Sequence, residues 1–264
     1  MAEIPIARRP EGLPSGAFRF DGRLFISALS VLIFLSLWET APRLHLVDIF
    51  YTSQPSRVVA AGAEILRSGS FLRDVSLSLS EFALGYSLAV ALGVSFGLLL
   101  GSFPTLRFLF DPLVMAVYAM PELALLPILV VWLGIGMSSK IAAVFIGAVI
   151  PILVNSIAGV RQVDRSLVLA ARSFCAGDRD VFVKVILPAS LPAVMVGIRL
   201  GMSRAVLGVV VAEMYVSQGG IGHQIMLLGS AFRVDSLLFY ALLVSGFGFA
   251  GTAGLRKMEE RLRK

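Results

Sequence analysis

The sequence predicts an all-α, polytopic membrane protein. Of its 264 residues 57% are hydrophobic and 15% are charged, and the mean hydropathy is +0.88. Soluble domains carry about 25% charged residues. Several apolar segments reach the roughly 17–25 residues that a bilayer-spanning helix needs. The net charge of +6 is spread along the chain instead of forming one basic patch, so a lipid bilayer is expected as partner and nucleic acid is not.

Six segments are expected to span the membrane as helices. They are Leu24–Ala41, Phe82–Ser102, Leu113–Leu133, Ile141–Val160, Leu191–Ala212 and Ser236–Leu255. This division predicts an N-terminal tail over 1–23, a transmembrane domain over 24–255 and a C-terminal tail over 256–264. The polar start of the chain is expected to be an uncleaved tail and not a signal peptide.

Lysine and arginine residues set the expected orientation. With the N-terminus inside, the inner segments carry fifteen of them and the outer segments six. Because cytoplasmic loops are enriched in these residues, both termini are expected in the cytoplasm, together with a charged loop over about 161–190. The long outer segment between the first two spans can hold an amphipathic helix over Val58–Leu66.

Small residues recur every fourth position in several predicted spans. In lipid, such ridges let helix backbones approach closely, so they predict helix packing within one subunit or between subunits. The positions are Gly85, Ala89, Gly93, Gly97 and Gly101 in the second span, Gly197 and Gly201 in the fifth, and Gly246, Ala250 and Gly254 in the sixth.

Polar residues inside the spans are candidates for function because intramembrane charge is costly. In the third span Glu122 follows Pro121, and Pro127 comes later, so this span is expected to bend and to line a pathway. Candidate pathway residues are Met120, Glu122, Asn155, Arg199, Arg204 and Glu213. Arg199 and Arg204 are five positions apart and should point to different faces. An alternative structural role is pairing with Glu122 or Glu213, and for Asn155 an interhelical hydrogen bond.

The charged loop between the fourth and fifth spans predicts a helix–turn–helix. Ser166–Phe174 has apolar residues at helical spacing, and Val181–Leu187 forms a second short pattern that should end at Pro188. Gly177 and Asp178 between them are turn formers. An amphipathic segment of this kind between two spans is suited to contact a soluble partner, whereas the alternative is a solvated loop that only anchors the spans.

Enzymatic motifs are missing from the sequence. It has no glycine-rich phosphate loop with a Gly-Lys pair. The single cysteine, Cys175, and the two histidines, His45 and His223, form no expected catalytic set or metal site. The chain is therefore not expected to be an enzyme or to bind a cofactor, and energy for uphill transport would come from a partner or an ion gradient.

Several motifs resemble the permease subunits of binding-protein-dependent ABC importers, in the branch that handles nitrate, taurine, sulfonates, bicarbonate and pyrimidine precursors. The motifs are Pro121-E-L-A-L-L-Pro127, V-W-L-G-I-Gly136, Leu187-P-A-S-L-Pro192, Gly197-I-R-L-Gly201 and Val211-A-Glu213. The charged loop looks like the cytoplasmic coupling loop of this family. Leu169-Ala170-Ala171 stands in the place of its Glu-Ala-Ala, and Cys175 in the place of its usual glycine.

The resemblance implies a type I importer core of six helices in a bacterial inner membrane. It implies a dimer of this chain, two ATPase subunits that carry ATP and Mg, and a periplasmic or lipid-anchored solute-binding protein. The ATPase-coupling residues would be Leu169, Ala170, Ala171, Arg172, Cys175, Gly177 and Asp178. The cargo would be a small, anionic solute.

Two alternatives from other classes stay open at this point. One is a gradient-driven secondary transporter or channel, and the other is a membrane scaffold without transport. Co-purification with an ATPase subunit would separate the first alternative from an ABC permease.

Overall fold

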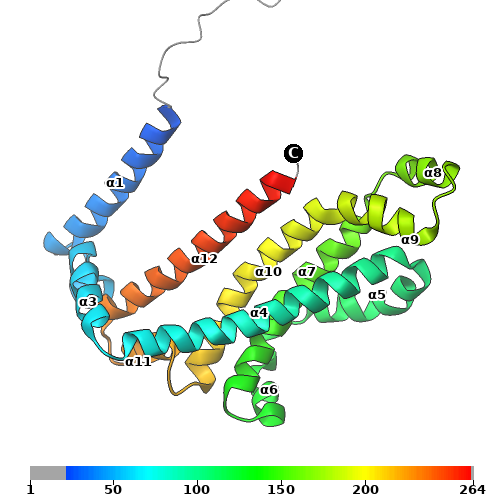
Figure 1. Ribbon diagram of the computed structural model, residues 1–264. Coiled ribbons are helices and arrows are strands. Elements are labelled where there is room, and N and C mark those ends of the chain that lie inside the picture. Colours follow the sequence, from blue (N-terminus) through cyan, green and yellow to red (C-terminus); the bar gives the residue numbers. More distant parts are fainter. Residues whose placement is uncertain (1–21, 263–264) are drawn as a thin grey trace, which may run out of the picture.

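The computed structural model describes residues 22–262, and these residues form helices and connecting turns with no strand among them (Figure 1). The α-helices are α1 Gly22–Arg43, α2 Ile49–Thr52, α3 Pro55–Arg67, α4 Phe71–Ser102, α5 Pro104–Ala119, α6 Leu126–Leu133, α7 Met137–Arg161, α8 Arg165–Ser173, α9 Asp178–Val181, α10 Leu187–Val216, α11 Ile221–Ser230 and α12 Val234–Leu262. Short 3-10 and π segments cover Glu122–Leu125 and Phe182–Ile186. The predicted tail over 1–23 lies outside the described residues except for its last two.

Five helices of the described chain are long and apolar enough to cross a membrane, and the number is six if one bent pair counts as a span. The predicted all-α membrane architecture is therefore confirmed. The bent pair is α5 with the segment Glu122–Leu133, and the two arms meet at 88°. The third predicted span is thus not one continuous helix. Pro121 lies at the break, whereas Pro127 lies in the first turn of α6, where its missing N–H breaks no helical bond.

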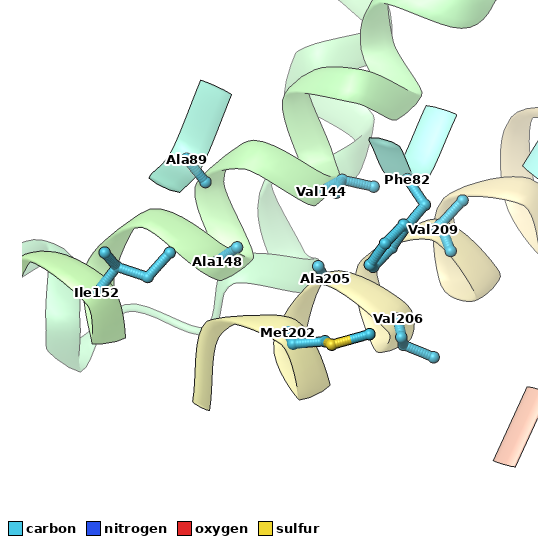
Figure 2. Close-up of a cluster of buried hydrophobic side chains, with 9 residues drawn as sticks. All are labelled: Phe82, Ala89, Val144, Ala148, Ile152, Met202, Ala205, Val206 and Val209. Carbon is cyan, nitrogen blue, oxygen red and sulfur yellow. The ribbon is translucent and has the colours of Figure 1, made fainter. Parts of the chain in front are cut away.

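The centre of the bundle is α7, which packs against α4 on one side and α10 on the other. The glycines of α4 meet α7 directly, because a Cβ built on Gly97 would lie 2.4 Å from Ser156 Cβ. On the other side, a Cβ on Gly201 would lie 2.7 Å from Ile152 Cγ1. The predicted small-residue packing of the second and fifth spans therefore operates within one chain. Figure 2 shows the core that results, with Ala89, Val144, Ala148, Ile152 and Ala205 facing one another.

The two terminal helices lie at the periphery. In Figure 1 α1 stands apart from the central helices, and its large apolar residues, such as Phe25 and Ile26, are exposed. The small-residue stripe of α12 is open at two positions, since a Cβ on Gly246 or Gly254 would meet nothing within 4 Å. Packing of that stripe against another subunit stays a prediction.

Two predicted boundaries differ from the structure. The second span was expected to begin at Phe82, but α4 begins at Phe71 and has 32 residues, a length of about 48 Å. The first three turns of α4 contain several polar side chains, so the continuous apolar run that predicts a span begins only at Phe82. The fourth span was expected to begin at Ile141, but α7 begins at Met137 and includes Lys140, which is only 4% exposed.

Candidate functional site

The α8–α9 segment projects from one end of the bundle (Figure 1). Asp164 caps α8, because its carboxylate accepts a hydrogen bond from the Ser166 N–H at 2.8 Å. That backbone hydrogen bond, with a second one from the Ser166 side chain, lowers the pKa of Asp164. The helix is 9 residues long, and the contacts of α8 are with α9 and the π segment.

The surface of this segment combines apolar side chains with charges. Leu167, Leu169 and Phe174 are exposed, and Phe174 has the highest exposure of the three at 87%. Arg172 pairs with Asp178 at 2.7 Å and closes the turn between the two helices. An exposed apolar edge of this kind, fixed in shape by a cap and an ion pair, can dock on another protein.

Cys175 supplies the turn that the sequence suggested for Gly177. Its φ is +58°, in the left-handed region that favours glycine, while Gly177 has φ −70°. The family residue at this position is usually glycine, and the backbone geometry gives a physical reason for that preference. The cysteine is free and exposed.

The second helix of the loop does not end at Pro188. Phe182–Ile186 forms a π-helical turn, with the Leu187 N–H bonded to Phe182 O, and the chain then continues directly into α10. Pro188 lacks an N–H, so it removes the bond that would close the preceding α-turn, and the wider π turn accommodates the loss. The α8–α9 segment is thus joined to a membrane span by continuous helix.

A cavity of about 480 Å³ lies between the bent third segment, α7 and α10. Met120, Glu122 and Arg204 of the candidate pathway residues all line it, together with Tyr118 and Ser203. Arg204 donates to Glu122 Oε1 at 2.8 Å. The Arg204 side chain is 56% exposed in one chain, so the pair is accessible from the cavity.

The other candidate pathway residues lie elsewhere. Arg199 pairs with Glu259 of α12 at 3.4 Å, and the two arginines do point to different faces as expected. Asn155 donates to Pro151 O of its own helix at 2.8 Å, although its Cβ approaches Gly197 of α10. Glu213 is fully buried and lies outside the cavity of Arg204; neither arginine pairs with it.

Glu213 belongs to a buried polar cluster near α11 that the sequence interpretation largely missed. We call it the α11 clamp; its members are Asp74, Ser78 and Glu81 of α4, Lys140 of α7 and Glu213 of α10. The sequence contains one indication of this cluster. The three α4 residues follow i, i+4, i+7 spacing, so they share one face of the helix. Within the part of the chain that the structure describes, no group of three or more His, Cys, Asp and Glu side chains could hold a metal ion.

Comparison with protein families decides the class. Residues 89–264 match the model of the binding-protein-dependent transport system inner membrane component. This chain belongs to that family. Its members are transport subunits and not enzymes, and the family implies ATPase and solute-binding-protein partners. The chain is therefore a multi-pass permease subunit of an ABC importer, and the alternatives of a gradient-driven transporter and of a scaffold are set aside.

Relatives extend the similarity over most of the chain. The taurine transport system permease protein of Escherichia coli K12 is 30% identical over 90% of this chain and 88% of its own length. A putative aliphatic sulfonates transport permease protein of the same organism is 32% identical over 79% and 81%. A putative ABC transporter permease protein of Methanocaldococcus jannaschii is 36% identical over 75% and 74%.

Solved structures share the fold. A chain of the MetNI methionine ABC transporter in an inward-facing conformation superposes with a TM-score of 0.62 at 18% identity. The match covers 72% of this chain and 95% of the other. A chain of an amino acid ABC transporter has a TM-score of 0.57 at 14% identity, over 75% and 94%. These neighbours show that the chain shares its helical fold with solved importer chains.

Proposed function

We propose that two copies of this chain form the translocation pathway of a bacterial inner-membrane importer for a small anion. The cargo would be a sulfonate, taurine, nitrate, bicarbonate or a solute of similar size and charge, delivered by a periplasmic or lipid-anchored binding protein. Two ATPase subunits, which carry ATP and Mg, would dock on the α8–α9 segments. Both termini and this segment would face the cytoplasm.

The observation that carries the pathway assignment is the Arg204–Glu122 pair. It faces a cavity of about 480 Å³ within the membrane-spanning part of the chain, near the middle of α10. Placing a charged guanidinium at that depth costs free energy unless a partner side chain, water or an anion stabilises the charge. Glu122 compensates it in the resting chain, and a passing anion can compete for the same guanidinium.

Two observations support docking at the α8–α9 segment. Its apolar side chains have no cover within the described chain, and Phe174 is 87% exposed. The α9 helix continues through the π turn into α10, which carries Arg204. A displacement of α9 by the ATPase would therefore move α10 directly. Rigid-body movement of a helix is one way in which such a displacement reaches a remote site.

The substrate class rests on the relatives and on the cavity charge. Two of the relatives are named as permeases for taurine and aliphatic sulfonates. These solutes carry a tetrahedral, negatively charged sulfonate group, to which taurine adds an ammonium group. Arg204 offers a planar guanidinium that binds such oxyanions through paired hydrogen bonds. Tyr118 and Ser203 add hydroxyl groups to the same cavity.

Replacing Arg204 by Gln tests the pathway assignment. Arg204→Gln removes the charge but keeps a polar side chain, so uptake of the anion should fall by at least tenfold with normal membrane abundance. Arg199→Gln is the matched control, because Arg199 lies on the same helix but pairs with Glu259 outside the cavity. Ligand binding by the separate binding protein should be unchanged in both.

A structural role would give a different pattern. In that case Arg204→Gln would reduce assembly, and neutralising Glu122 as well would restore it, because the unpaired carboxylate causes the loss. Wild-type uptake in Arg204→Gln would remove the pair from the pathway.

A further inference from the structure

The α11 clamp holds the first turn of α11 against the bundle. Three consecutive amides donate to it: Gly220 N to Asp74 Oδ1 at 2.9 Å, Ile221 N to Ser78 Oγ at 2.9 Å, and Gly222 N to Glu213 Oε2 at 2.8 Å. The glycine at 220 is required, because its φ is +99° and a Cβ there would lie 2.2 Å from Glu213 Oε1. The clamp therefore connects α4, α10 and α11 through side-chain-to-backbone hydrogen bonds.

The buried charges of the clamp do not balance. Glu81 and Glu213 are 0% exposed, and Lys140 is 4% exposed. Lys140 Nζ pairs with Glu81 Oε1 and donates to Ser217 Oγ. One cation thus faces two carboxyl groups that are fully buried, and a buried charge without compensation is strongly destabilising. The third carboxylate, Asp74, is 5% exposed. Its two oxygens accept from Gly220 N and from Gln224 Nε2 at 2.9 Å, and it lines a polar cavity together with Arg73.

The hydrogen bonds show which carboxyl oxygen of the cluster lacks a donor. Both oxygens of Glu213 have donors, since Ser78 Oγ donates to Oε1 at 2.6 Å and Gly222 N to Oε2. Glu81 Oε2 is fully buried and has no donor from any described residue. Ser78, which donates to Glu213, lies one turn before Glu81 on the same buried face of α4, so the two carboxyl groups belong to one buried cluster. Two fully buried carboxyl groups that share a single cation cannot both be ionised at an acceptable cost, so one of them holds a proton.

We propose that Glu81 and Glu213 share one bound proton, so that the α11 clamp is a proton-binding site inside the bundle. The proton supplies the donor that Glu81 Oε2 lacks and leaves one negative charge for the pair. Lys140 neutralises that charge from α7, and the N-terminal end of α11 adds its favourable dipole. This site is separate from the cavity of Arg204 and goes beyond the transport function proposed above.

The proposal predicts how stability responds to pH. The other charged or titratable groups facing the clamp are Lys140 from α7, Asp74 from α4, and Tyr240 from α12, which lies near Asp74. The folded chain holds a proton that Glu side chains of an unfolded chain release at neutral pH. Because the folded state binds more protons, stability falls as the pH rises through the point where the pair deprotonates.

Infrared spectroscopy of the full-length chain in lipid nanodiscs tests this directly. The wild type should show the carbonyl band of a protonated carboxylic acid at pH 7, with a shift in D2O. Glu81→Gln and Glu213→Gln should each lose the band. Glu64→Gln is the matched control, because Glu64 is exposed on α3, and it should leave the band unchanged.

Melting curves of the same variants provide a second readout. Gln has the shape of a protonated Glu, so each single variant should accumulate and melt close to the wild type, with less dependence on pH. The double variant leaves Lys140 without a carboxylate and should melt well below both singles. No band in the wild type, a band that survives in both singles, or singles as unstable as the double variant would overturn the proposal. A sodium-dependent melting temperature without a carbonyl band would also overturn it, because a metal cation would then replace the proton.

Discussion

Phe174 provides a sharp test of the docking surface. Its side chain is 87% exposed in the chain, so nearly all of its apolar area is available for burial against an ATPase subunit. Full burial of a Phe side chain contributes about 1.5–3 kcal/mol. Phe174→Ala should therefore weaken each ATPase contact by roughly 2 kcal/mol, or about 30-fold in Kd.

The assay is titration of the purified ATPase subunit onto nanodiscs that contain the permease. Phe249→Ala is the matched control, because Phe249 is 76% exposed but lies on the membrane-spanning α12. Both variants should reach normal membrane abundance, and only Phe174→Ala should lose ATPase affinity and ATP-driven uptake together. Unchanged affinity in Phe174→Ala would show that the ATPase contacts another surface and would refute the reasoning.

Three further predictions concern topology, the turn and the packing. A membrane-impermeant maleimide should label the exposed Cys175 in inside-out vesicles and not in spheroplasts; labelling from the outside would reverse the orientation. Cys175→Gly should slow amide hydrogen exchange in α8, because relief of the left-handed strain outweighs the added chain entropy by roughly 0.5–1 kcal/mol, and faster exchange would contradict that balance. Gly97→Ala should lower the melting temperature, since its Cβ would lie 2.4 Å from Ser156 Cβ; Gly254→Ala, where nothing lies within 4 Å, should not, and equal effects would dismiss the packing argument.

The features that could be predicted from the sequence are those set by local patterns. Long apolar runs predicted the spans, and Pro121 predicted the bend in the third segment. The four-residue spacing of small residues predicted close helix packing, and the structure shows that the partner of α4 is α7. The arginines of the fifth span were correctly separated onto different faces because five residues do not complete a whole number of turns.

The rest depends on contacts between distant segments. The clamp joins residues that are 135 positions apart, such as Ser78 and Glu213, and no local pattern in the sequence predicts such pairing. The π turn before α10 was missed because Pro188 favours a helix end unless the preceding turn widens. Pairing with Glu122 or Glu213 was the structural alternative for both arginines; Arg204 does pair with Glu122, but α12 brings Glu259 to Arg199.

The central claim is that this chain conducts a small anion only under the control of an ATPase. The most direct measurement is uptake of radiolabelled taurine or an alkanesulfonate into proteoliposomes that contain the chain, its ATPase subunits and its binding protein. Uptake should require all three components and ATP, and it should persist when an uncoupler collapses the ion gradients. Uptake by the chain alone, driven by an imposed gradient and independent of ATP, would contradict the account.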